Sequence, residues 1–203
     1  MNLPGRDHPV LPYPGPHLVL GGPIAGPWPD GTEVIYLAMG CFWGVEEIYW
    51  RLPGVVCTSV GYMGGATANP TYEEVCTGRT GHAEAACIAY DPAQVPTLAI
   101  LRVFWECHDP TQGNRQGNDI GSQYRSGIWW TTPEQHDLAV LTRDAFAEVI
   151  AGRGYPPITT EILPAAGVPY FLAEDYHQQY LYKNPNGYRC HSTTGLRLPD
   201  VGR

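Results

Sequence analysis

The chain has 203 residues, a length that suits one domain with a substantial core, and it carries a formal net charge of −8. This acidic balance argues against nucleic acid or an anionic membrane as a partner, because both favour clustered Lys and Arg. Charged residues make up 16% of the chain, whereas Gly, Pro and Tyr number 24, 20 and 13. We therefore expect a loop-rich, aromatic-rich protein, with a monomer as the default state.

Prolines recur throughout residues 1–32, which predicts an irregular arm that either lies on the domain or is disordered. Residues 33–203 are expected to form a single domain with an irregular C-terminal tail over about 184–203. The prolines interrupt the apolar run that a secretion signal needs, and no apolar run in the sequence is long enough to cross a bilayer. A cytoplasmic location follows as the expectation.

The first predicted strand, 33–39, is a short apolar run bounded by glycines. Apolar residues from Val45 to Leu52 then recur with helical spacing, and Pro53 ends that helix. Cys41 is therefore expected at a corner between a strand and a helix.

Two alternating segments, 54–65 and 82–92, predict further strands, and residues 69–81 join them as a loop or short helix. A helix with one apolar face follows, and Pro110 limits it. Residues 111–125 are predicted to be a long loop, too rich in Gly, Asn and Gln to belong to the core.

The last predicted elements are a strand at 126–132, a capped helix over 132–152, a strand at 159–163 and a helix at 173–184. Strands and helices are interspersed without a regular βαβ rhythm. The expected fold is therefore α+β, a two-layer sandwich with a mixed β-sheet covered by helices and long loops.

Six cysteines are present, and because no export signal is evident, free thiols are expected rather than a disulfide framework. No C-x-x-C motif occurs, which argues against a structural zinc site and against a thioredoxin-type motif, so no metal is expected. Cys57, Cys87 and Cys107 are interpreted as small buried hydrophobes, while Cys76 could lie near the site.

The position of Cys41 favours reactivity. A helix N-terminus carries unpaired N–H groups and a partial positive charge, and both stabilise a thiolate. Glycines flank the cysteine and let the backbone approach closely, while Phe42 and Trp43 can form an apolar cup beside the sulfur. These features alone predict a nucleophile and leave its substrate open.

Five motifs extend this interpretation: GCFWGVE, NPTYEEV, GHAEA, QGNDIGSQYRSGI and HQQYLYKNPNGY. In order, and over most of residues 33–198, they closely resemble the A-type peptide methionine sulfoxide reductases. The resemblance implies reduction of the S epimer of methionine sulfoxide, free or in proteins, through a cysteine sulfenic acid. It also implies thioredoxin as the final reductant, replaceable by dithiothreitol, and no bound cofactor.

By the same resemblance, Cys41 is the nucleophile, and Phe42 and Trp43 hold the S-methyl group of the substrate. Family members commonly keep a second, resolving cysteine in the tail, and Cys190 is the one cysteine there. A sulfenic acid condenses readily with such a thiol. The tail carries no further cysteine, so thioredoxin would have to act directly on a Cys41–Cys190 disulfide.

The resemblance further makes Glu84 the proton donor to the sulfoxide oxygen. Tyr72 and Tyr124 are expected to hydrogen-bond that oxygen, and Asp119 to brace the network. This arrangement is chemically reasonable, because a sulfoxide oxygen leaves only when protonated. Glu84 must then be buried enough to keep its proton near neutral pH, and tyrosine hydroxyls donate without adding charge.

Two other classes of function stay open. A cysteine-dependent acyl hydrolase would use Cys41, His82 and Asp119 and would not need the tail thiol. A redox-sensing domain would have a reactive cysteine without turnover. Glu46 and Glu47 are interpreted as charges in the first helical turn, and His82 as a loop histidine with satisfied hydrogen bonds.

Overall fold

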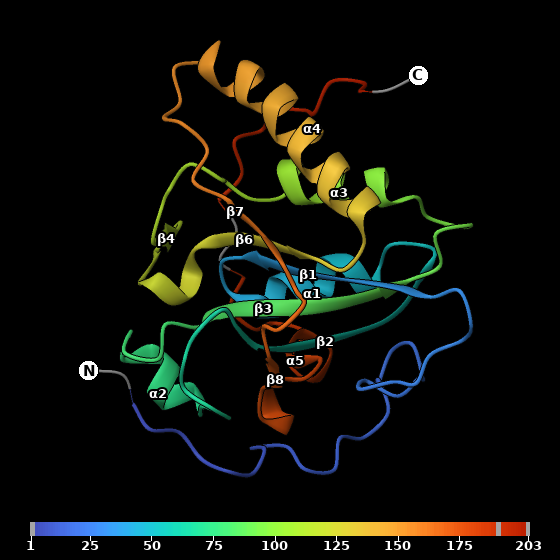
Figure 1. Ribbon diagram of the computed structural model, residues 1–203. Helices are drawn as coiled ribbons and strands as arrows, with labels where there is room; N and C mark the ends of the chain where they lie inside the picture. Colours follow the sequence, from blue (N-terminus) through green and yellow to red (C-terminus); the bar gives the residue numbers. More distant parts are fainter. Residues whose placement is uncertain (1–2, 190–191, 202–203) are drawn as a thin grey trace.

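The computed structural model describes residues 3–189 and 192–201. Its helices and strands follow one another in chain order (Figure 1): β1 (Glu33–Met39), α1 (Phe42–Trp50), β2 (Val55–Met63), α2 (Tyr72–Cys76), β3 (Ala83–Tyr90), α3 (Thr97–Glu106), β4 (Arg115–Gln116), β5 (Asp119–Ile120), η1 (Ser122–Tyr124), β6 (Ser126–Trp130), α4 (Pro133–Ala151), β7 (Glu161–Pro164), β8 (Tyr170–Leu172), η2 (Asp175–His177) and α5 (Tyr180–Lys183).

Six strands form one mixed sheet in the order β7-β6-β1-β3-β2-β8. All neighbouring strands are antiparallel except β6 and β7, which are parallel. The short strands β4 and β5 pair with each other in a separate hairpin. The predicted α+β class with a mixed sheet is confirmed.

One face of the sheet packs against helices. On β1, Ile35, Leu37 and Met39 are fully buried, and they belong to the same core cluster as apolar residues of α1, α3 and α4. Their spacing of two residues places them on one side of the strand. In Figure 1, α3 and α4 lie above the sheet.

The N-terminal arm packs on other parts of the protein. Ile24 forms a small buried cluster with Cys57 of β2 and Ala89 of β3, and Leu11 and Trp28 pack against that cluster. Of the two possibilities that the prolines allow, the arm therefore lies on the domain. In Figure 1 it runs in blue below the sheet, starting beside α2.

Two sequence predictions are wrong in detail. The expected helix 173–184 is divided into the 3₁₀ turn η2 and the short helix α5, because Gln179 between them has a left-handed backbone with φ of 47°. Residues 111–125 do contribute to the interior, since Gln116 and Gln123 are 1% and 5% exposed. The predicted start of the long helix is confirmed, because the Thr132 hydroxyl accepts the Gln135 N–H.

Within residues 3–189 and 192–201, no helix has the length and apolar character needed to span a membrane.

Candidate active site

Cys41 lies at the predicted corner, where β1 ends and α1 begins. It is the N-cap residue of α1 and is 6% exposed. Gly40 precedes it with φ of +92°, and a Cβ at that position would lie 2.5 Å from the side chain of Gln116. Glycine is therefore required here both by the backbone conformation and by the close approach of β4.

Glu84 lies next to the same helix N-terminus. It is 2% exposed, and its Oε2 accepts a hydrogen bond of 3.0 Å from the N–H of Phe42, the first residue of α1. Burial and the negative charge of Asp119 raise the pKa of Glu84 from 4.5 to about 8, although the Phe42 N–H lowers it. Near neutral pH the carboxyl is therefore mostly protonated, directly beside the backbone that follows Cys41.

The indole of Trp43 is held by the segment that contains η2 and α5. Its Nε1–H donates to Nδ1 of His177 at 2.9 Å, and its ring stacks on Tyr180 with a centroid distance of 3.8 Å and an interplanar angle of 14°. The His177 ring also lies 5.1 Å from the ring of Phe42. Together these rings form an ordered apolar wall next to Cys41.

His177 is a neutral ring at this position. Burial lowers its pKa to about 4, and because Nδ1 accepts the indole N–H, the proton must be on Nε2. Among the described residues, Nε2 has no hydrogen-bond partner, and it lies 3.8 Å from a carboxylate oxygen of Glu174. Sequence reasoning missed this residue, although it opens the HQQY motif.

Tyr72 and Tyr124 border the same site. Tyr72 begins α2, and its ring centroid lies 4.6 Å from that of His177. Burial raises the pKa of both tyrosines well above the ordinary value, and the charge of Glu84 raises both further. The charge of Asp119 also acts on Tyr124. Both hydroxyls are therefore protonated donors near neutral pH, within electrostatic range of the carboxyl.

The described part of the tail contacts β5 and α1. The Tyr188 hydroxyl donates to Asp119 at 3.2 Å, and Arg189 makes two hydrogen bonds to the carboxylate of Glu47, at 2.7 and 2.8 Å. Cys190, the predicted resolving cysteine, lies outside the described residues.

The interpretation of Glu46 and Glu47 as first-turn charges is wrong. Both follow the first turn of α1 and are buried, at 0% and 7% exposure. The Glu46 carboxylate accepts hydrogen bonds from the Thr58 hydroxyl and from the backbone N–H and side-chain amide of Gln179, at 3.1, 2.8 and 2.7 Å. Burial raises the pKa of Glu46 to about 7.

His82 has the structural role expected of it. Its Nδ1 accepts the N–H of Gly65 at 3.1 Å, so Nε2 carries the proton and donates to the carbonyl of Thr67 at 2.7 Å. Both ring nitrogens are therefore used by the 65–67 loop. This leaves His82 unable to act as the base that an acyl hydrolase would need at Cys41.

The remaining cysteines differ in exposure. Cys57 and Cys87 are buried as predicted, and Cys107 is partly buried against the core. Cys76 is exposed at the end of α2, and burial raises the pKa of its thiol while the side chain of Tyr72 lowers it. Across residues 3–189 and 192–201, no cluster of three or more His, Cys, Asp or Glu side chains is arranged to hold a metal ion.

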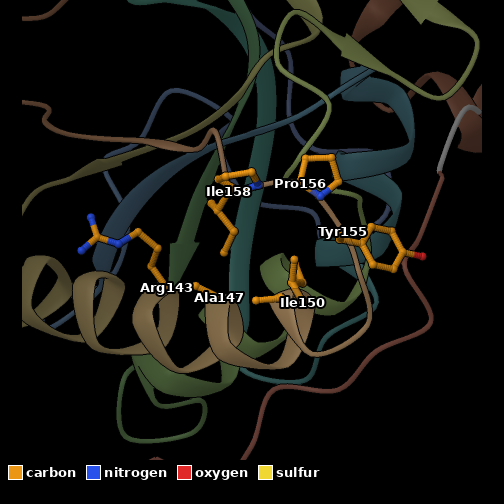
Figure 2. A pocket seen from close by; sticks show the side chains of 8 residues that line it. Arg143, Ala147, Ile150, Tyr155, Pro156 and Ile158 are labelled. Atoms are coloured by element: carbon orange, nitrogen blue, oxygen red, sulfur yellow. The ribbon is translucent and has the colours of Figure 1, made fainter.

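A separate pocket of about 350 Å³ lies between α4 and the segment that follows it (Figure 2). Its lining is apolar apart from one arginine and one tyrosine hydroxyl and consists of Arg143, Ala147, Ile150, Ala151, Tyr155, Pro156, Pro157 and Ile158. None of the predicted site residues that the structure describes lines this pocket.

The fold and the corner site together define an α+β protein with one mixed sheet and a cysteine at the N-terminus of its first helix. The sequence pattern of the family described as peptide methionine sulfoxide reductase matches residues 33–200. The chain belongs to this family. It is 58% identical over 199 residues to peptide methionine sulfoxide reductase MsrA of Salinispora arenicola, covering 97% of this chain and 89% of that protein.

Solved structures agree with this assignment. Methionine sulfoxide reductase A of Corynebacterium diphtheriae is 50% identical, with a TM-score of 0.88 over 98% of this chain and 96% of that one. Reduced Mxr1 from Saccharomyces cerevisiae is 34% identical, with a TM-score of 0.72 over 83% and 95% of the two chains. Mxr1 has also been crystallised in complex with Trx2, and that structure, at 22% identity and a TM-score of 0.52, is similar in fold.

Proposed function

We propose that this enzyme reduces methionine-S-sulfoxide, free or in proteins, to methionine, with Cys41 as the nucleophile and Glu84 as the proton donor. The observation that carries the proposal is the buried carboxyl of Glu84 on the Phe42 N–H, with a pKa raised to about 8. An acid that is protonated at neutral pH lies on the backbone N–H of the residue after Cys41, and removal of a sulfoxide oxygen requires such an acid.

In the first step, the Cys41 sulfur attacks the sulfoxide sulfur while the oxygen gains a proton from Glu84. Tyr72 and Tyr124 donate hydrogen bonds to that oxygen, and Asp119 braces the network. Phe42 and Trp43 contact the S-methyl group. The oxygen ends on Cys41 as a sulfenic acid and methionine leaves, so the substrate sulfur is reduced and the cysteine sulfur is oxidised.

In the second step, the thiol of Cys190 condenses with the sulfenic acid, which releases water and forms a Cys41–Cys190 disulfide. Thioredoxin then reduces this disulfide and is itself oxidised. The contacts of Tyr188 and Arg189 with β5 and α1 support a tail that runs beside the site. Crystals of the relative Mxr1 with the thioredoxin Trx2 support the external reductant. We assign these steps to residues 33–203, including the tail from about 184.

The test of the first step is stereochemical. With racemic methyl p-tolyl sulfoxide and dithiothreitol, we expect the S enantiomer to disappear and the R enantiomer to remain, as followed by chiral chromatography. Equal loss of both enantiomers, or loss of neither, would contradict the proposal. Turnover also separates this enzyme from a redox sensor, which would consume no more than one equivalent.

The second step is tested with two serine variants. Cys190→Ser should still produce about one equivalent of methionine per enzyme in a single turnover, while losing thioredoxin-supported turnover. Cys76→Ser is the matched control, because Cys76 is the exposed thiol next to Tyr72, and it should retain turnover. The opposite pattern would assign the resolving role to Cys76.

A further inference from the structure

The first residues of the N-terminal arm bind the loop that leads into Tyr72. The Thr67 hydroxyl donates to the carbonyl of Leu3 at 3.0 Å, and the Arg6 N–H donates to the carbonyl of Ala68 at 3.0 Å. Gly5 and Ala68 form a parallel β-bridge. The arm therefore adds backbone pairing to a loop that belongs to none of the named strands.

The Arg6 side chain reaches the start of α2. Its guanidinium makes two hydrogen bonds of 3.0 Å to the two carboxylate oxygens of Glu74, a geometry that fixes both groups. Both side chains are 26% exposed. Glu74 in turn accepts the N–H of Thr71 at 2.9 Å, and the Thr71 hydroxyl accepts the N–H of Glu74, which forms the capping box of the helix. Arg6 thus holds the box that starts α2 at Tyr72.

Arg6 also holds a strained residue in the loop. Asn69 has φ of 45°, in the left-handed region that side chains rarely adopt. The Asn69 carbonyl accepts a hydrogen bond from Arg6, and its side-chain amide donates to the Arg6 carbonyl at 2.9 Å. The arm thereby stabilises a backbone conformation that the loop would otherwise have to hold by itself.

Residues outside the arm also contact the 65–72 loop. His82 binds Gly65 and Thr67, and the Tyr72 N–H donates to Glu174 at 2.9 Å. These contacts lie at the two ends of the 65–72 loop. Between them, the described side-chain contacts that hold Asn69 and its neighbours come from the arm.

From these contacts we infer that the arm is a positioning element of the active site, with Arg6 as the positioning residue that sets the hydroxyl of Tyr72 on the sulfoxide oxygen. This inference rests on the role proposed for Tyr72. Because Arg6 touches neither substrate nor Cys41, its effect must pass through the loop and the capping box.

The direct test is a double-mutant cycle. Arg6→Gln should lower kcat/KM for methyl p-tolyl sulfoxide by about tenfold, since small displacements of a catalytic group have effects of this size or larger. Arg6→Lys, which keeps the charge, should restore part of the loss. In a Tyr72→Phe background, Arg6→Gln should cause no further loss, because the hydroxyl that it positions is absent. An equal loss in both backgrounds would overturn the inference.

A second pair of variants changes the docking of the arm without changing charge. In Gly5→Ala, the new Cβ would lie 2.2 Å from the carbonyl oxygen of Ala68, at a residue with φ of +74°. In the control Gly15→Ala, also in the arm, nothing lies within 4 Å of the new Cβ. Gly5→Ala should lower kcat/KM as much as is expected for Arg6→Gln, and Gly15→Ala should have the kcat/KM of the wild-type enzyme. Equal activity of both would contradict the inference.

Amide hydrogen exchange separates failure of this inference from failure of the proposed role of Tyr72. Arg6→Gln should speed exchange over residues 67–76, while Arg143→Gln, which removes an arginine paired with Asp144 on α4, should leave those amides unchanged. If Tyr72→Phe alone keeps wild-type activity, the proposed role of the Tyr72 hydroxyl is wrong, and hydrogen exchange alone tests whether the arm holds the loop. In that case, unchanged exchange in Arg6→Gln would reject the inference that Arg6 positions the loop.

Discussion

At the scale of single residues, Glu84, the proposed proton donor, shows how burial lets a carboxyl keep its proton. One oxygen of its carboxyl accepts the Phe42 N–H, which favours the charged form. Burial and the negative charge of Asp119 act in the opposite sense and prevail, so the pKa rises to about 8. The second oxygen can therefore hold a proton next to the backbone of Cys41 near neutral pH.

The first prediction concerns the pH dependence of this donor. Because the raised pKa keeps Glu84 protonated below about 8, the rate of reduction should fall as pH rises through that value. Glu84→Gln keeps the shape but has no acidic proton, so its rate should be lower by about 10²–10⁴-fold. The measurement is a single-turnover rate between about pH 6 and pH 9.5, which avoids the titration of the external reductant.

The Glu84→Gln variant provides the control for the pH dependence of the single-turnover rate. If the fall near pH 8 comes from Glu84, it should be absent from the residual rate of Glu84→Gln. A fall of the same size in both proteins would assign the titration to another group.

A second prediction at this scale concerns Trp43. His177→Phe keeps an aromatic ring but removes the acceptor of the indole N–H, and an unsatisfied donor of this kind costs about 1–3 kcal/mol. We expect KM for the sulfoxide to rise by about tenfold with a smaller change in kcat, because the indole leaves its place in the wall. His136→Phe is the matched control, since His136 lies beside a different indole, that of Trp130, and it should leave KM unchanged.

At the scale of elements, the segment 174–180 differs most from its sequence-based prediction. Its composition suits a continuous helix, yet Gln179 has φ of 47°. The cause is distant in sequence: Glu46 of α1 accepts both the backbone N–H and the side-chain amide of Gln179. Gln178 exchanges hydrogen bonds with the backbone of Val60 on β2. Local periodicity contains no information about either partner.

Elements that depend on local signals were predictable. The strand 33–39, the helix that starts behind Cys41 and the cap at Thr132 all follow from spacing and capping chemistry, and the structure contains each of them. The three-residue strand β8 was missed because it is too short to show alternation. In the site, the position of Cys41 at a helix start predicted a nucleophile, and the resemblance supplied the other candidate residues. The buried contacts of Glu46 and His177 needed the tertiary structure.

The corner at Gln179 gives a prediction for stability. Gln179→Gly can adopt the left-handed backbone and loses the side-chain hydrogen bonds with Glu46 and with the N–H of Leu18. Gln179→Val loses the same two bonds and places a β-branched residue at φ of 47°, which adds about 1–3 kcal/mol of strain. Urea unfolding should therefore show Gln179→Val to be the less stable of the two. Equal stability would mean that the backbone conformation is not constrained in the way proposed.

At the scale of the whole molecule, the arm, the sheet and α1 meet around buried titratable groups. His17 of the arm donates through Nε2 to the Thr58 hydroxyl, since its Nδ1 accepts backbone N–H groups of Val19 and Leu20. The Thr58 hydroxyl then donates to Glu46. Burial lowers the pKa of His17 to about 4 and raises that of Glu46 to about 7. The arm is therefore joined to α1 through a buried polar network, and the stability of this contact depends on the protonation of His17 and Glu46.

The last prediction is the pH dependence of stability, which these groups control with opposite signs. Glu46 and Glu84 bind a proton more tightly when folded, so their contribution is complete below their ordinary pKa of 4.5 and is lost as pH rises through about 7 and 8. His17 and His177 resist protonation when folded, so their contribution is present above 6.5 and is lost as pH falls towards about 4. Burial also lowers the pKa of His82, so three histidines oppose the two carboxyls between 4.5 and 6.5, whereas above 6.5 the two carboxyls dominate this set of groups.

Thermal unfolding should therefore give a Tm that does not fall across that interval and a decrease as pH rises from about 6.5 to about 8. Glu46→Gln removes one of the two carboxyls and should make the decrease shallower, whatever its effect on the absolute Tm. Glu148→Gln, at an exposed position on α4, should leave the slope unchanged. A Tm that stays constant through pH 8 in the wild-type protein would show that the buried carboxyls do not keep their protons, and the proton donor proposed for the reaction would lose its physical basis.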